Sequence, residues 1–138
     1  MIYFDTSLLV AALASEAATP RAQEAINEAT TIAVSEWSLT EFAAAFSIKL
    51  RMRTVSETDR ATARRRLQRY IAQNFELLPV NGSHFRQATA FADDHQSNLR
   101  AGDALHLAIA AEIGATVWTL DQRMAAAGPL VGVATRLV

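Results

Sequence analysis

The sequence predicts an α/β fold in which helices cover both faces of a mostly parallel central sheet of about five strands. Short apolar segments alternate with helical segments along the chain, a pattern typical of parallel sheets. The length of 138 residues fits one domain, residues 1–138. The chain contains no cysteine, which excludes disulfides and thiolate metal sites.

Five short apolar or β-branched segments are the predicted strands. In chain order they are residues 2–4, 31–34, 75–80, 115–120 and 131–138. The first ends at Asp-Thr-Ser, and the second is rich in β-branched residues. The third precedes Asn81-Gly82, which predicts a turn, and the fourth follows Gly114, which is expected to end a helix.

The helices expected between these strands begin at recognisable capping residues. In chain order they are about 8–15, 21–28, 38–53, 56–74, 83–96 and 103–113, with a short helix before Gly128. Thr6 or Ser7 can cap the first helix. Ser38 and Glu41 have the spacing of a capping box at the third, although that helix can also begin near Ser35.

Four acidic residues stand in apolar surroundings, whereas the other ten lie mostly in polar segments. They are Asp5, Glu41, Asp103 and Asp121. Taken singly, each has a structural explanation as a helix cap or as an acid in a first helical turn. However, Asp5 and Asp121 both follow predicted strands, and parallel sheets place their functional crevice at the carboxyl ends of the strands. We therefore expect all four carboxylates to converge there.

Four clustered carboxylates repel one another, and a divalent cation removes this conflict. Hard oxygen ligands suit Mg²⁺ or Mn²⁺. Two divalent ions balance four negative charges, so we expect one or two ions, and two when substrate is bound. Metal-assisted cleavage of a phosphodiester requires no nucleophilic serine, cysteine or histidine. The cluster therefore predicts a metal-dependent nuclease.

The basic residues are concentrated in one segment. Residues 49–69 carry eight of the 13 lysines and arginines, including Arg64, Arg65 and Arg66. Arginine binds phosphate through a planar fork of donors. The alternative to a nuclease is thus a non-catalytic α/β module that binds RNA or a protein partner through residues 49–69, with the carboxylates acting only as caps.

Histidine and tryptophan give weaker signals. His106 lies three residues after a candidate carboxylate, but its helix is apolar, which favours a core or interface position. His84 and His95 occupy polar helical positions and are expected to be solvated. Trp37 and Trp118 can stack on bases, although such residues more often fill a core or interface.

Four segments resemble the PIN-domain ribonucleases, and in particular VapC-like toxins of type II VapBC toxin–antitoxin pairs. They are FDTSLLVA, SLTEFAAA, LRAGDALHLAIAAE and TVWTLDQRM, in the family's order. The resemblance implies a three-layer α/β/α sandwich. It also implies an Mg²⁺- or Mn²⁺-dependent endoribonuclease that leaves a 5′-phosphate and a 3′-hydroxyl.

The resemblance assigns roles to particular side chains. The family's four acids fall on Asp5, Glu41, Asp103 and Asp121. The family often places a hydroxyl near the metal, and Ser7 and Thr119 match those positions, with Thr6 as the neighbouring choice.

The resemblance also implies partners. These are an RNA substrate, a VapB-like antitoxin whose tail blocks the crevice, and a second copy in a homodimer. Operator DNA would be bound only through the antitoxin. Arg100 can orient phosphate or pair with a site carboxylate, and Arg64, Arg65 and Arg66 can contact RNA or antitoxin. The first residues show no charged leader and no apolar span exists, so we expect a cytoplasmic protein without membrane contact.

Overall fold

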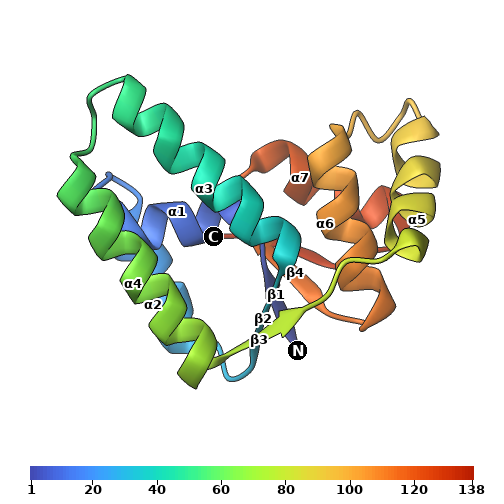
Figure 1. Ribbon diagram of the computed structural model, residues 1–138. Helices are drawn as coiled ribbons and strands as arrows, with labels where there is room; N and C mark the ends of the chain where they lie inside the picture. The colour runs from blue at the N-terminus through green and yellow to red at the C-terminus, as the bar shows by residue number, and fades with distance from the viewer.

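The computed structural model describes residues 1–138 and has one five-stranded sheet at its centre (Figure 1). The strands are β1 Ile2–Phe4, β2 Ile32–Ser35, β3 Phe75–Leu78, β4 Thr116–Thr119 and β5 Thr135–Leu137. Their order in the sheet is β3-β2-β1-β4-β5, and every neighbouring pair is parallel. The predicted fold class is therefore confirmed.

Helices cover both faces of this sheet, which makes a three-layer α/β/α sandwich (Figure 1). They are α1 Thr6–Leu13, α2 Thr19–Glu28, α3 Glu36–Arg51, α4 Glu57–Gln73, α5 Gly82–Asp93, α6 Ala101–Glu112 and α7 Gln122–Ala127, followed by a 3₁₀ turn, Gly128–Val131. No helix combines the length and the apolar character that a membrane crossing requires.

Alternate strand residues supply two separate cores, because successive side chains point to opposite faces of a sheet. Phe4, Val34 and Trp118 pack with α1 to α4. Tyr3 and Val117 pack with α5 to α7. Each fully buried Phe or Val side chain stabilises the fold by about 1.5–3 kcal/mol. The inner strands are buried on both sides, which explains why they lack polar–apolar alternation in the sequence.

The first helix begins two residues earlier than predicted, at Thr6 and not at Leu8. Neither Thr6 nor Ser7 is its cap, because both already lie inside α1. Asp5 is the N-cap, and its side chain accepts a hydrogen bond from the backbone N–H of Leu8. The residue at the end of β1 thus ends the strand and starts the helix, which leaves the two hydroxyl groups free for other contacts.

Two further helix starts differ from the simplest prediction. Ser35 is the cap of α3, and Ser38 closes its capping box, so Glu41 is not the capping-box acid. Glu41 instead lies more than one turn inside the helix. Asn81 and Gly82 do not form an isolated turn, because Asn81 caps α5 and Gly82 is its first residue.

The strand order reverses beside β1. From β1 the chain moves outward through β2 to β3, and it then returns to the other side of β1 to form β4 and β5. In open parallel sheets the functional crevice lies at the carboxyl ends of the strands at such a switch point. The ends of β1 and β4 are therefore where a functional site is expected.

Candidate active site

The four predicted carboxylates line one hollow of about 340 Å³ at this switch point. Asp5 follows β1, Glu41 comes from α3, Asp103 lies in the first turn of α6 and Asp121 caps α7. Its other polar lining residues are Thr6, Ser7 and His106. Four segments that are far apart in the sequence thus bring their acids to one place.

Asp5 is almost completely buried, at 4% exposure, and is held by hydroxyl groups. Ser7 Oγ donates to Asp5 Oδ1 at 2.7 Å, and Thr119 Oγ1 donates to Oδ2 at 3.0 Å. Burial raises the pKa of Asp5, while the charge of His106 and these hydroxyl hydrogen bonds act in the opposite direction. The carboxylate therefore has a fixed orientation.

Glu41 is half-buried and receives two short hydrogen bonds on one oxygen. Thr6 Oγ1 and His106 Nε2 each lie 2.6 Å from Glu41 Oε2. Burial acts to raise the pKa of Glu41, but the hydrogen bond and charge of His106, together with Thr6, outweigh burial and lower it. Glu41 is therefore ionised at neutral pH.

Asp103 is the least satisfied member of the cluster. Its Oδ2 atom is buried and has no hydrogen-bond partner. Burial raises the pKa of Asp103, and the negative charges of Asp121 and Glu41 raise it further. No lysine or arginine forms an ion pair with any of the four carboxylates. His106 beside Glu41 is the only cationic type of side chain that lines the hollow, so its four carboxylates carry an excess of negative charge.

These donors fit a hydrated divalent cation. No three of the protein's acidic or histidine side chains are close enough in this conformation to hold one ion by themselves. Mg²⁺, however, keeps several waters and usually binds through one or two carboxylates directly. The unpartnered oxygen of Asp103 and the mutual repulsion with Asp121 are features that such a cation would relieve.

Histidine predictions were partly wrong. His106 is buried as expected, at 1% exposure, yet it also touches the site through Glu41. The only sequence feature that indicates this contact is the three-residue spacing between Asp103 and His106, because residues i and i+3 lie on the same face of a helix. His84 is not solvated but buried, and its Nδ1 accepts a hydrogen bond from the backbone N–H of Asn81 at the start of α5. His95 is exposed, as predicted.

The candidate arginines are dispersed. Arg100 is exposed and forms no ion pair with a site carboxylate. Arg64 lines a groove of about 350 Å³ between α3 and α4, together with Arg60 and apolar residues. Arg65 is exposed and contacts its own helix, and Arg66 lines a different hollow near the end of α1. The Arg64–Arg66 run therefore presents several surfaces.

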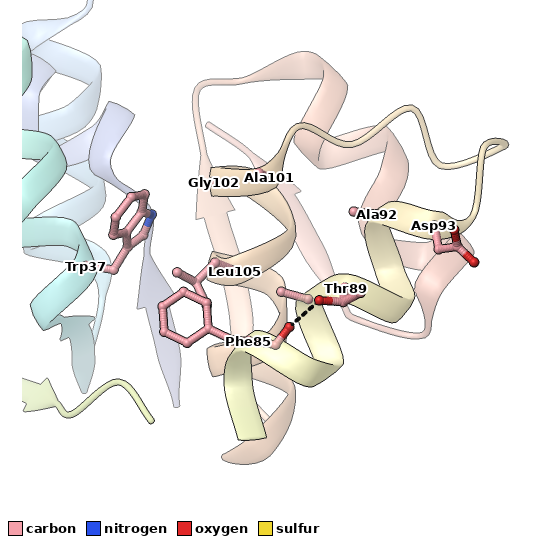
Figure 2. A pocket seen from close by; sticks show the side chains of 9 residues that line it. Trp37, Phe85, Thr89, Ala92, Asp93, Ala101, Gly102 and Leu105 are labelled. Atoms are coloured by element: carbon pink, nitrogen blue, oxygen red, sulfur yellow. Dashed lines mark hydrogen bonds between the residues drawn. The ribbon is translucent and has the colours of Figure 1, made fainter. Parts of the chain in front are cut away.

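A larger groove of about 460 Å³ lies between α3, α5 and α6 (Figure 2). Trp37 of α3, Phe85 of α5 and Leu105 of α6 line it, and the indole ring of Trp37 lies beside Gly102. Gly102 also adjoins the site, since a Cβ atom there would stand 2.9 Å from Glu41 Oε1. Trp37 is partly buried at this boundary, whereas Trp118 is a core residue, as predicted.

Comparison with solved structures identifies the same fold in several proteins. VapC20 of Mycobacterium tuberculosis, described as a sarcin–ricin loop cleaving toxin, superposes with a TM-score of 0.76 at 18% identity, covering 93% of this chain and 95% of that one. FitAcB from Neisseria gonorrhoeae gives 0.69 at 20% identity, with 98% and 96% covered. VapBC2 from Rickettsia felis, bound to a promoter DNA fragment, gives 0.69 at 17% identity, with 99% and 98% covered.

Sequence comparison assigns the family. No curated protein sequence matches the chain. The family model described as the PIN domain matches residues 2–129, which is nearly the whole chain. The fold, the switch-point hollow and this match agree with the resemblance seen in the four sequence segments, and the chain belongs to the PIN-domain family.

Proposed function

We propose that this protein is an Mg²⁺- or Mn²⁺-dependent endoribonuclease whose site is formed by Asp5, Glu41, Asp103 and Asp121. The observation that carries the proposal is the convergence of these four carboxylates on one hollow with no lysine or arginine to compensate them. Membership of the PIN-domain family supports it.

The side chains have separable tasks in such a site. A divalent ion bound here would supply an activated water and offset charge on the scissile phosphate. Ser7 and Thr119 would keep Asp5 in one orientation. Glu41, with its lowered pKa, would remain an anionic hydrogen-bond acceptor at neutral pH. Asp103 and Asp121 would bring two further carboxylates close enough to influence each other.

We further propose that the protein is the toxin of a type II toxin–antitoxin pair and acts in the cytoplasm. Structures of similar fold include the VapBC2 and FitAB complexes on DNA fragments. The groove between α3 and α4 has an apolar floor and a rim containing Arg60 and Arg64, which suits an amphipathic, acidic antitoxin segment. A homodimer, and operator DNA bound only through the antitoxin, complete the proposed assembly.

The first test is cleavage of total RNA by the purified protein with Mg²⁺ or Mn²⁺, and with EDTA. We expect discrete fragments that disappear in EDTA and with Asp5→Asn. Asparagine is also a good N-cap, so this substitution retains the capping residue type at the start of α1. Glu36→Gln, which removes an exposed acid from the same helix as Glu41, is the matched control and should cleave normally.

The same assay separates the nuclease from the binding-module alternative. If the protein only binds RNA or a partner, Asp5→Asn and Asp103→Asn should leave its function intact, and joint substitution of Arg64, Arg65 and Arg66 should abolish it. Wild type and Asp5→Asn behaving alike on RNA, with no Mn²⁺ bound in calorimetry, would contradict the nuclease proposal.

A further inference from the structure

We infer that Tyr3 and His106 form a buried relay that positions Glu41 in the carboxylate hollow. This inference rests on the proposed function, since it assigns His106 a role in the same site. It goes beyond that proposal because neither Tyr3 nor His106 is among the four acids or their supporting hydroxyls. Both are positioning residues, which act through Glu41.

The relay is a continuous chain of hydrogen-bonded side chains from three elements. The hydroxyl of Tyr3, on β1, lies 2.8 Å from Ser35 Oγ and 2.7 Å from His106 Nδ1. His106, on α6, reaches Glu41 Oε2 of α3 through Nε2 at 2.6 Å. The chain thus begins at the buried capping box of α3 and ends at a carboxylate that lines the hollow.

The direction of the hydrogen bonds in the relay follows from its last residue, Glu41. An ionised carboxylate can only accept, so His106 Nε2 carries a proton and donates to Glu41. In the neutral imidazole Nδ1 then accepts from the hydroxyl of Tyr3, whereas in the charged imidazolium Nδ1 donates to that hydroxyl, and Ser35 makes the complementary hydrogen bond in either case. Both ring nitrogens are used in this way. His106 is therefore oriented as a support for Glu41 and has no free lone pair to offer a metal ion.

The other oxygen of Glu41, Oε1, occupies space that is open because residue 102 is a glycine. Gly102 stands so close that a Cβ atom there would lie 2.9 Å from Glu41 Oε1. Thr6 shares Oε2 with His106 through its own hydroxyl at 2.6 Å. With Oε2 held by two donors, the carboxylate has little freedom to rotate. Such orientation is what a group that binds a hydrated cation requires, and loss of an orienting partner typically reduces metal affinity or activity about 10- to 100-fold.

Tyr3→Phe gives the sharpest test. It removes only the hydroxyl, keeps the buried ring and changes no atom that touches Glu41. We expect Mn²⁺ affinity, measured by calorimetry, to fall about tenfold, with a matching fall in kcat for RNA at fixed Mn²⁺ and an unchanged KM. Tyr70→Phe is the matched control, because that ring stacks on Phe75 away from the hollow, and it should bind Mn²⁺ as wild type does.

His106 itself is tested with two substitutions. His106→Leu removes both nitrogens and should weaken Mn²⁺ binding about 10- to 100-fold. His106→Gln retains an N–H donor that can reach Glu41 and should restore part of the affinity, which a merely space-filling role would not predict. If His106→Leu fails to fold by circular dichroism, Tyr3→Phe decides the question.

The outcomes separate this inference from the proposed function. Wild-type Mn²⁺ affinity and kcat in Tyr3→Phe, with Asp5→Asn unable to bind or cleave, would overturn the relay alone. No Mn²⁺ binding by the wild type would overturn both. A loss in Tyr3→Phe with normal behaviour of Tyr70→Phe would establish that the relay positions Glu41.

Discussion

At the scale of single residues, two of the four acids both cap a helix and line the hollow. Asp5 caps α1 through Oδ1 while Thr119 holds its Oδ2. Asp121 caps α7 by accepting backbone hydrogen bonds on Oδ1 at 2.7 Å and 3.1 Å. A carboxylate has two oxygens, so one can satisfy a helix end while the group faces a crevice. The structural and functional interpretations of these residues are therefore compatible.

Asp103→Asn should stabilise the metal-free protein. The pKa of Asp103 is raised by burial and by the charges of Asp121 and Glu41, so the associated stability is complete below its ordinary value of 3.8 and is lost as the pH rises through the raised value. Asparagine does not ionise. At pH 7 in EDTA we expect a gain of at most about 1 kcal/mol, or roughly 3 °C in Tm, because solvent screens the half-exposed carboxylate, together with loss of cleavage.

Thermal unfolding of the two proteins between pH 7 and pH 4 checks this sign. The advantage of the variant should shrink as the pH falls, because the wild-type carboxyl then gains its proton. A variant that is less stable than wild type at pH 7 would show that ionised Asp103 is compensated by another group.

At the scale of secondary-structure elements, helix phase decides which side chains face the hollow. Because α3 begins after Ser35, Glu41 lies past its first turn and reaches His106. On α6, Asp103 and His106 are three residues apart and share one face. Residues 104–110 of α6 are buried, which accounts for their continuous apolar sequence.

The three consecutive arginines of α4 should affect substrate binding and not chemistry. Replacing Arg64, Arg65 and Arg66 together with alanine leaves the hollow intact, since none of them lines it. We expect KM for RNA to rise severalfold, kcat to stay unchanged and the salt dependence of KM to weaken, because each lost phosphate contact lowers the slope by about 0.7 for a single strand. Steady-state cleavage at several salt concentrations measures all three.

Arg21→Ala, an exposed arginine on α2, is the control for that experiment. An unchanged KM and salt slope in the triple variant would mean that α4 does not contact RNA, and would leave its arginines to the antitoxin.

At the scale of the whole molecule, the two cores share every inner strand of the sheet. Tyr3 and Phe4 are neighbours on β1, yet they pack into opposite layers. Neither layer of helices can unfold alone, because the strands that it covers also form the core on the other side of the sheet. We therefore expect residues 1–138 to unfold in a single cooperative transition, as one domain.

Chemical denaturation followed by circular dichroism and by tryptophan fluorescence should give coincident curves, since Trp37 and Trp118 lie on different elements.

Mn²⁺ at about 100 times its Kd should raise the free energy of unfolding of the wild type by about 2.7 kcal/mol and leave that of Asp5→Asn unchanged. Two separated transitions, or equal stabilisation of both proteins, would contradict these expectations.

The sequence alone predicted the fold class, the approximate elements and the four candidate acids. Local features carry that information: alternating strand and helix segments, capping residues, and acids such as Asp5 and Asp121 that follow apolar strands. Predicted boundaries missed by one or several residues, because Asp5 and Ser35 compete with nearby hydroxyl residues for the capping position and only packing selects between them.

Tertiary structure alone decided which groups meet. The contacts of His106 with Tyr3 and Glu41 join residues 103 and 65 positions apart, so no local pattern could reveal them. Burial of His84 and the clearance at Gly102 likewise depend on neighbouring elements. Spacing along a chain specifies which face of its own helix or strand a side chain occupies. What that face contacts, and hence the support of Glu41, is set only when the helices pack on the sheet.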